Sequence, residues 1–188
     1  MENLNFKLFF AINAGITPQP SVAKFAIFIA NWVIYIIPVM LFLIWLMSVQ
    51  STTRYKMIEA SLASCVSLIA ARIFSLVWFS PRSFMINIGT QLVPHTLDNS
   101  FPSDHMTFAW SIASSLLIYS KTRTLGAAIM IVGIAIGWAR IYVGVHWPFD
   151  IIGGVLAGTV GALVVHLYAQ PVAMLVSRIS EKIHAAII

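Results

Sequence analysis

Long apolar runs separated by short polar breaks dominate this chain. A helix needs about 20 mostly apolar residues to cross a bilayer, and these runs have the length and the low charge that such helices require. The pattern predicts spans at about residues 23–48, 57–79, 105–120, 125–142 and 149–170. We therefore expect an all-α integral membrane bundle of about five transmembrane helices, folded as a single domain over residues 1–188.

The N-terminal segment departs from this pattern. Glu2 and Lys7 interrupt its apolar stretch, so it does not resemble a cleavable signal peptide. Phe6, Phe9 and Phe10 surround Lys7. Aromatic rings mixed with a cation suit the headgroup region better than the hydrocarbon core. We expect this segment to lie along the membrane interface.

Basic residues follow every second span and indicate the topology. The pairs are Arg54 with Lys56, Lys121 with Arg123, and Arg178 with Lys182. By the positive-inside rule, the side that carries them is cytoplasmic. The N-terminus and the loops at about residues 80–104 and 142–148 are then expected on the outer face of the membrane.

Composition supports a bilayer and argues against several other classes. The chain is 60% hydrophobic and 9% charged, with a mean hydropathy of +0.91, which a soluble globule of 188 residues cannot bury. The net charge of +5 is scattered at the ends of apolar runs, so nucleic acid is not an expected partner. The single Cys65 excludes an intramolecular disulfide. No internal repeat is evident, which disfavours a transporter.

Glycines spaced four apart indicate close helix packing. Gly133 with Gly137, and Gly154 with Gly158, form two small-xxx-small patterns. Small residues let helix backbones approach where lipid offers no hydrophobic drive between helices. We interpret both pairs as packing positions.

Ionisable residues gather in and beside the two outer loops. Three of the six acidic residues in the chain lie there, with three histidines and two arginines. Charged groups at a membrane boundary are often only solvated caps, but so many together favour a site. The residues are Arg82, His95, Asp98, Asp104, His105, Arg140, His146 and Asp150.

The segment from Ala139 to Asp150 carries the most information. Pro148 suits the first position of a helix, which places Asp150 in the first turn, four residues after His146. A carboxylate bonded to one imidazole nitrogen leaves the other nitrogen free to attack. The alternative for Asp150 is a simple contact with the helix dipole. Arg140 offers a planar fork of donors for phosphoryl oxygens.

A second polar segment, Phe101-Pro102-Ser103-Asp104-His105, directly precedes the third span. Ser103 fits a helix N-cap. Alternatively, the helix start holds phosphate oxygens, and His105 donates a proton to the departing oxygen. Together the two segments indicate phosphoryl transfer.

These residues resemble the type 2 phosphatidic acid phosphatase superfamily, whose motifs read KxxxxxxRP, PSGH and SRxxxxxHxxxD. The second motif has Asp104 for Gly, and the third has Ala139 for Ser. The first keeps Arg82 but has Ser83 for Pro and Ser75 for Lys. The Pro-Ser-Asp-His variant, the small size, the five spans and the His146-Trp147-Pro148 run are similar to bacterial undecaprenyl-diphosphatases of the bacitracin-resistance type.

The resemblance implies a fold, a mechanism and roles for residues over nearly the whole chain. It implies attack by His146 to form a phosphohistidine, without metal or cofactor, with Asp150 orienting His146 and His105 protonating the leaving group. Phosphate binding is implied for three residues and extended to two more. The first three are Arg82, Ser103 and Arg140; the other two are Asp104, within the second motif, and Arg72.

Arg72 has two interpretations of equal weight. It lies inside the second span, where an unpaired charge is costly, and it shares a helix face with Ser75. It either supplies the charge that Ser75 lacks or extends to lipid headgroups. His95, Asp98 and Asn99 either shape the lip of the site or form a solvated loop.

The implied function is hydrolysis of undecaprenyl diphosphate at the outer face of a bacterial inner membrane, which recycles the carrier of peptidoglycan synthesis and confers bacitracin resistance. The expected partners are this lipid diphosphate and membrane lipids. Phosphatidate or phosphatidylglycerophosphate as substrate, and transfer of phosphate to another lipid, remain alternatives, because the motifs bind phosphate and do not read the lipid. A small lipid-binding or transport protein is the alternative from a different class. The oligomeric state stays open.

Overall fold

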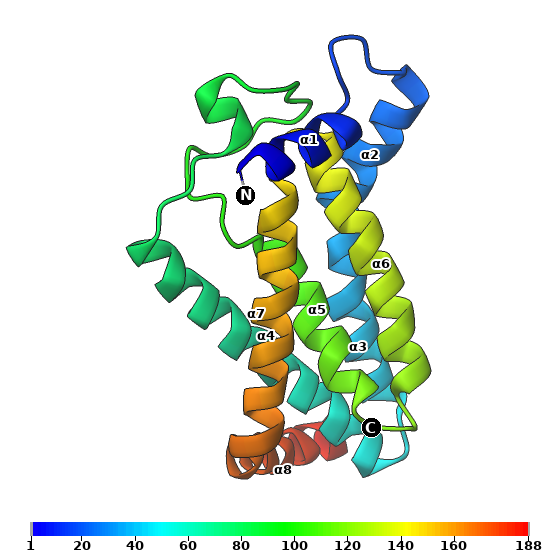
Figure 1. Ribbon diagram of the computed structural model, residues 1–188. Coiled ribbons are helices and arrows are strands. Elements are labelled where there is room, and N and C mark those ends of the chain that lie inside the picture. Colours follow the sequence, from blue (N-terminus) through cyan, green and yellow to red (C-terminus); the bar gives the residue numbers. More distant parts are fainter. Residues whose placement is uncertain (1, 188) are drawn as a thin grey trace.

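The computed structural model describes residues 2–187, with side chains for 3–186, and every regular element in that range is a helix (Figure 1). In chain order these are α1 (Glu2–Ile12), α2 (Pro20–Trp32), η1 (Val33–Tyr35), α3 (Ile36–Met47), α4 (Ser51–Val77), η2 (Ser83–Ile86), α5 (Asp104–Leu117), α6 (Arg123–Tyr142), α7 (Pro148–Tyr168) and α8 (Gln170–Ile187). The expected all-α class is confirmed.

Four helical stretches among the described residues are long and apolar enough to cross a membrane: Pro20–Met47, Ser51–Val77, Arg123–Tyr142 and Pro148–Tyr168. The first consists of α2, η1 and α3, which follow one another without a break. These stretches correspond to the first, second, fourth and fifth expected spans. The molecule is therefore a multi-pass membrane protein.

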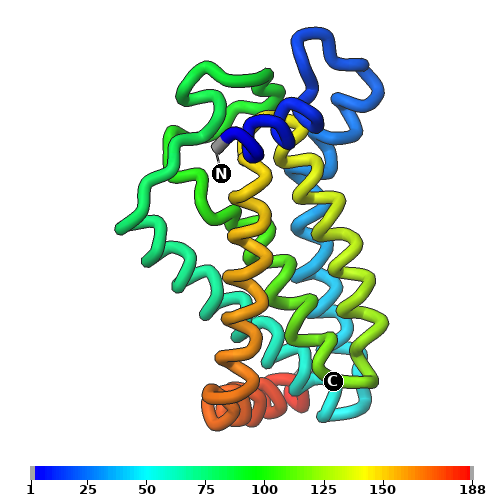
Figure 2. The backbone as a smooth tube through the Cα atoms, in the orientation of Figure 1, coloured from blue at the N-terminus to red at the C-terminus, as the bar shows by residue number. Residues whose placement is uncertain are grey.

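The third expected span is α5, which is shorter than the others. Its 14 residues extend about 21 Å at 1.5 Å per residue, less than the roughly 30 Å of a hydrocarbon core. It packs against α4, α6 and α7 and lies among them in Figures 1 and 2. Because protein surrounds α5, its ends need not reach both surfaces of a bilayer.

Two features differ from expectation at the end of the bundle opposite α1: the start of α4 and an additional helix, α8. There α4 begins at Ser51 rather than near residue 57, so Arg54 and Lys56 belong to its first turns. Beyond the fifth span, α8 lies across the bundle (Figure 1), and its Glu181 forms an ion pair with Arg54. The helix α8 was not expected. We call this end the basic end, and the end that carries α1 the loop end.

A buried carboxylate joins the helices at the basic end. Glu59 of α4 is fully buried and accepts hydrogen bonds from Tyr119, after α5, and from Gln170, the first residue of α8. His166 of α7 lies 3.3 Å from one Glu59 oxygen, and Lys56 Nζ lies 3.3 Å from the other. A buried charge is tolerated when it is paired and hydrogen-bonded, as here. The cluster ties together α4, α7 and α8.

Glycines let α7 lie directly on α5. A Cβ atom at Gly154 would lie 2.8 Å from the Ser103 carbonyl oxygen, and one at Gly158 would lie 2.7 Å from the Ser111 nitrogen. Both contacts are with backbone, which cannot yield without separating the helices. The predicted packing role of this pair is confirmed. It also holds the start of α5 beside the start of α7.

The N-terminal helix α1 lies across the loop end of the bundle (Figures 1 and 2). Phe9 is buried against Trp147, with ring centroids 4.7 Å apart. Just after α1, the Asn13 amide donates hydrogen bonds to the carbonyl oxygens of Thr90 and Tyr142. These contacts place α1 crosswise over the loops that hold the polar residues.

Candidate active site

His146 lies in the tight loop between α6 and α7. Gly144, with φ of +76°, makes the turn, and a Cβ there would lie 2.2 Å from the Thr90 carbonyl oxygen. The turn closes with a hydrogen bond from the Val145 nitrogen to the Arg140 carbonyl oxygen. The turn directs His146 into the bundle, where it is 1% exposed.

Asp150 holds one side of the His146 ring. Its Oδ2 accepts hydrogen bonds from the Trp147 nitrogen, at 2.7 Å, and from the Ser100 hydroxyl. His146 Nδ1 lies 3.4 Å from the same oxygen. Pro148 begins α7, which sets Asp150 in the first turn facing back towards the loop, as the spacing predicts.

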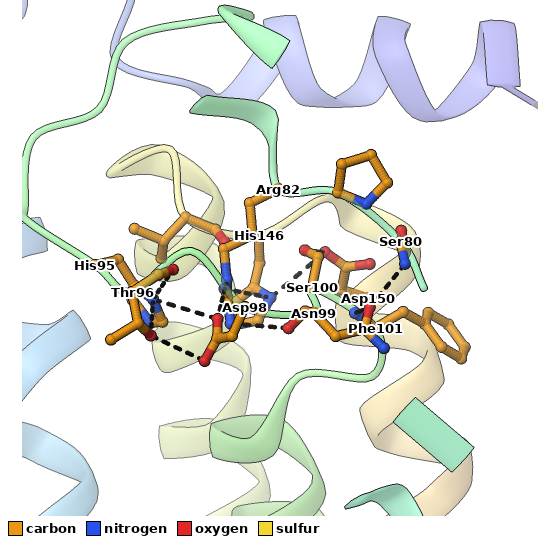
Figure 3. A network of polar contacts seen from close by, with 12 residues as sticks. Ser80, Arg82, His95, Thr96, Asp98, Asn99, Ser100, Phe101, His146 and Asp150 are labelled. Carbon is orange, nitrogen blue, oxygen red and sulfur yellow. Dashed lines mark hydrogen bonds and ion pairs between the residues drawn. The ribbon is translucent and has the colours of Figure 1, made fainter. Parts of the chain in front are cut away.

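Arg82 also contacts the His146 ring (Figure 3). Its Nη1 donates to the Val145 carbonyl oxygen at 2.7 Å and lies 3.3 Å from His146 Nε2. Both contacts are satisfied when Nδ1 carries the proton towards Asp150 and Nε2 is unprotonated. Nη1 also lies 3.5 Å from Nδ1, so it sits beside both ring nitrogens, and this tautomer leaves Nε2 unprotonated near the guanidinium, where an anion would bind.

The surroundings of His146 keep its ring neutral. Burial, and then the charges of Arg140 and Arg82, lower its pKa well below the ordinary value. A lowered pKa means that the unprotonated form persists as the pH falls. The imidazole is therefore available as a nucleophile at neutral pH.

Arg140 and Ser103 present buried polar atoms without partners in the described part of the chain. Arg140, in the last turn of α6, is 3% exposed, and its Nε donates to no acceptor there. Ser103 Oγ is likewise buried and unpaired. Such atoms remain available to hydrogen-bond a bound molecule. A guanidinium and a hydroxyl together suit a phosphoryl group.

The segment before α5 joins this cluster through its backbone. Ser103 is the N-cap residue of α5, but its hydroxyl forms no capping hydrogen bond. Its nitrogen instead donates to the Asp150 carbonyl oxygen at 3.0 Å, which links α5 to α7. Asp104, which is exposed, and His105, which is half-buried, follow in the first turn of α5.

The profile of one family, the PAP2 superfamily, matches residues 21–174. The chain belongs to the PAP2 superfamily. It is 37% identical over 163 residues to "Putative undecaprenyl-diphosphatase YbjG" of Escherichia coli, covering 87% of this chain and 81% of that protein. It is 31% identical over 184 residues to "Undecaprenyl-diphosphatase BcrC" of Bacillus subtilis, covering 96% and 93%.

A solved PAP2-like fold supports the same assignment. The crystal structure of LpxE of Aquifex aeolicus superposes with a TM-score of 0.70 at 25% identity, covering 88% of this chain and 96% of that one. The family expected from the motifs is thus confirmed.

Departures from the first PAP2 motif have structural consequences here. Ser83, in the place of the motif proline, donates a hydrogen bond to the Gly144 carbonyl oxygen at 3.0 Å and so ties this loop to the His146 turn. Ser75, in the place of the lysine, donates to the Arg72 carbonyl oxygen within its own helix. Arg72 itself is exposed on α4, and no hydrogen bond joins it to this cluster among the described residues.

Three residues outside the motifs complete the cluster: His95, Asp98 and Ser100 (Figure 3). Asp98 and His95, for which the sequence allowed either a lip of the site or a solvated loop, contact the two motif arginines. Ser100 was not predicted, because a lone serine in a loop carries no signal of its partner. The clustering of charge in this loop was the signal for the other two.

Metal ligands do not gather in this cluster. In residues 2–187, no group of three or more His, Cys, Asp or Glu side chains is arranged to hold a metal ion. The positive charge beside His146 comes from Arg82 and Arg140, which are both buried.

Proposed function

We propose that this protein hydrolyses undecaprenyl diphosphate to undecaprenyl phosphate and inorganic phosphate. The observation that carries the proposal is the buried, neutral His146, in contact with both Asp150 and Arg82. The names of the relatives in Escherichia coli and Bacillus subtilis support the choice of substrate. We further propose that the reaction takes place at the outer face of a bacterial cytoplasmic membrane; the basic end, opposite the site, supports this orientation.

The first step is attack by His146 Nε2 on the terminal phosphorus. The N–P bond forms, and the bond from that phosphorus to the bridging oxygen breaks. Undecaprenyl phosphate departs on the bridging oxygen and takes a proton from His105, at the start of α5, whose ring is protonated once the negative charge of the bound diphosphate offsets the neighbouring arginines. Asp150 stabilises the Nδ1 proton as the ring becomes positively charged.

The second step is attack by water on the phosphohistidine. His105, now unprotonated, takes a proton from that water, the N–P bond breaks, and inorganic phosphate leaves. Both steps pass through a phosphoryl group with charge on its three outer oxygens. We assign the neutralisation and binding of those oxygens to Arg82, Arg140 and Ser103. Asp104, exposed beside Ser103, is proposed to lie at the edge of this phosphate site.

An apolar cavity beside Asp150 suits the hydrocarbon part of such a substrate. It has a volume of about 590 Å³ and is bordered by α1, the loop end of α4 and the start of α7. A second cavity of about 320 Å³ continues between α4 and α7 and shares Phe74 and Phe101 with the first. Towards the loop end α4 diverges from α7 (Figures 1 and 2). The aromatic residues bordering the first cavity are Phe6, Phe74, Trp78, Phe101, Trp147 and Phe149.

The function is tested by phosphate release from the detergent-solubilised protein. Undecaprenyl diphosphate, phosphatidate and phosphatidylglycerophosphate are supplied in parallel, and we expect the highest kcat/KM with the first. His146→Ala should retain helix content but less than about 1% of the activity, because covalent catalysis contributes orders of magnitude. A phosphate label that is acid-labile and base-stable should disappear with it.

The matched control is His184→Ala, which removes a histidine at the basic end that contacts the Leu46 carbonyl oxygen. We expect wild-type turnover from this variant. Activity above about 1% in His146→Ala would remove His146 as the nucleophile. If another lipid phosphate has the highest kcat/KM, the proposed mechanism stands but the proposed substrate is wrong.

A further inference from the structure

The segment of residues 95–99, here called the covering segment, contacts both site arginines, and its contacts with Arg82 are drawn in Figure 3. Asp98 Oδ1 accepts a hydrogen bond from Arg82 Nε at 2.8 Å, and the Asn99 carbonyl oxygen accepts one from Arg82 Nη2 at 3.1 Å. At the other arginine, Arg140 Nη2 lies 2.9 Å from His95 Nε2. The segment belongs to none of the three PAP2 motifs.

Each of the three guanidinium nitrogens of Arg82 already donates one hydrogen bond in this arrangement. Asp98 engages Nε, the Val145 carbonyl oxygen engages Nη1, and the Asn99 carbonyl oxygen engages Nη2. Nη1 and Nη2 each keep a second N–H, but a phosphoryl group that binds the Nε edge with two hydrogen bonds must replace Asp98, because Nε carries only one N–H. Carboxylate and phosphate are equivalent kinds of acceptor for a guanidinium.

Asp98 is the acceptor most open to exchange. Its side chain is 40% exposed, whereas the guanidinium side chain that it contacts is 6% exposed. The other two acceptors are backbone carbonyls. A second hydrogen bond holds Asp98 in place, from the Thr96 hydroxyl to Oδ2 at 2.9 Å.

The charge states of Asp98 and His95 are consistent with their contacts to the two arginines. Burial alone would raise the pKa of Asp98, but the hydrogen bonds from Thr96 and Arg82 outweigh it and hold the pKa below the ordinary value. The carboxylate is thus ionised at neutral pH. Burial, Arg82 and Arg140 lower the pKa of His95, so its neutral Nε2 accepts a hydrogen bond from Arg140.

We propose that Asp98 occupies, on Arg82, the place of a substrate phosphoryl oxygen and is displaced when the headgroup binds, which makes it a specificity-determining residue. This inference rests on the proposed hydrolysis of a lipid diphosphate. A diphosphate carries more negative charge than the monophosphate product, so it competes better with a carboxylate for Arg82. The returning Asp98 then favours release of the product and of inorganic phosphate.

The experiment measures binding of inorganic phosphate by calorimetry, with the full-length protein in detergent. Asp98→Asn keeps the shape but removes the charge that competes for Arg82. We expect it to bind phosphate about tenfold more tightly or better, since hydrogen bonds to charged groups contribute about 1.5 to 3 kcal/mol. The ratio of kcat/KM for undecaprenyl diphosphate to that for phosphatidate should fall.

Three further variants sharpen the test. Asp98→Glu keeps a carboxylate and should bind phosphate as the wild type does. Glu181→Gln removes one negative charge at the basic end, next to Arg54, and should also leave binding unchanged. Thr96→Val loosens Asp98 without removing its charge and should tighten phosphate binding by a smaller factor, which provides a second measurement if Asp98→Asn does not fold.

Unchanged or weaker phosphate binding in Asp98→Asn would overturn the proposal, because Asp98 would then only position Arg82. The proposal is also overturned if Asp98→Asn does not fold and Thr96→Val fails to tighten binding. Since calorimetry needs no turnover, a wild-type protein that binds phosphate but releases none from undecaprenyl diphosphate contradicts the proposed function alone.

Discussion

A single carboxylate oxygen organises the residues around His146. Asp150 Oδ2 accepts hydrogen bonds from a backbone nitrogen and a hydroxyl and faces His146 Nδ1. These two hydrogen bonds fix the position of Oδ2, which in turn favours the tautomer with the proton on Nδ1. In the proposed mechanism the unprotonated Nε2, 3.3 Å from Arg82 Nη1, is the attacking atom.

Arg72 provides the sharpest prediction at the residue scale. It is an exposed arginine on α4, and Ser75, in the place of the family lysine, turns its hydroxyl to the Arg72 carbonyl oxygen. We propose that the Arg72 side chain contacts the substrate phosphate when the lipid binds. Arg72→Met should lower kcat/KM by about 10- to 100-fold, the effect of losing one charged hydrogen bond. Arg72→Lys should retain more of the rate.

Adding Ser75→Lys to Arg72→Met is the matched test, because it returns a cation to the position that the family pattern uses. We expect partial recovery of kcat/KM. Wild-type kcat/KM in Arg72→Met would instead assign Arg72 to lipid headgroups and leave phosphate binding to Arg82 and Arg140.

Motif spacing predicted contacts between residues that are close in sequence. It did not predict contacts between residues that are far apart in sequence and meet only in the folded chain. The separation of four between His146 and Asp150, with Pro148 between them, is enough to place the carboxylate against the ring. By contrast, Ser100 meets Asp150 across 50 positions, and His95 meets Arg140 across 45. Such pairs follow from how the loop folds over the bundle, which has no local signature.

At the scale of elements, the contact of α5 with α7 decides where the motifs meet. A methyl group at Gly158 would lie 2.7 Å from the Ser111 nitrogen and 2.8 Å from the Thr107 carbonyl oxygen. We expect Gly158→Ala to lower the thermal unfolding midpoint and the turnover together, because overpacking costs about 1 to 3 kcal/mol. Melting followed by circular dichroism in detergent, beside phosphate release, measures both.

Gly133→Ala is the control for this substitution. A methyl group there would meet nothing nearer than the Ala109 Cβ atom, at 3.6 Å, which is ordinary contact. It should leave the midpoint unchanged or raise it, since alanine favours a helix over glycine by about 1 kcal/mol. Equal effects of the two variants would show that the close approach of α5 and α7 does not hold the site.

Hydropathy predicted the long helices and was less informative about α5 and α8. The helix α5 ends at Leu117, and its polar residues Ser111 and Ser115 are buried against neighbouring helices. In α8, Leu175, Ile179 and Ile183 recur every four residues and are exposed, which is the pattern of an amphipathic helix. Because its polar residues lower its mean hydropathy, α8 was not detected in a search for membrane spans.

At the scale of the whole molecule, charge is divided between the two ends. Six of the eleven Lys and Arg residues lie at the basic end: Arg54, Lys56, Lys121, Arg123, Arg178 and Lys182. Of the other five, Arg82 and Arg140 are buried in the site. Since the positive-inside rule counts basic residues in short loops, the basic end should face the cytoplasm.

This orientation is testable because Cys65 is the only cysteine. In a Cys65→Ser background, Ile16→Cys reports the loop end and Ser120→Cys the basic end, and both positions are exposed on connecting segments. We expect a membrane-impermeant maleimide to label Ile16→Cys in intact bacterial cells and Ser120→Cys only after permeabilisation. Both variants should label in detergent, which controls for reactivity. The opposite pattern would place His146 and its arginines on the cytoplasmic side, where the enzyme would meet lipid phosphates of the inner leaflet instead.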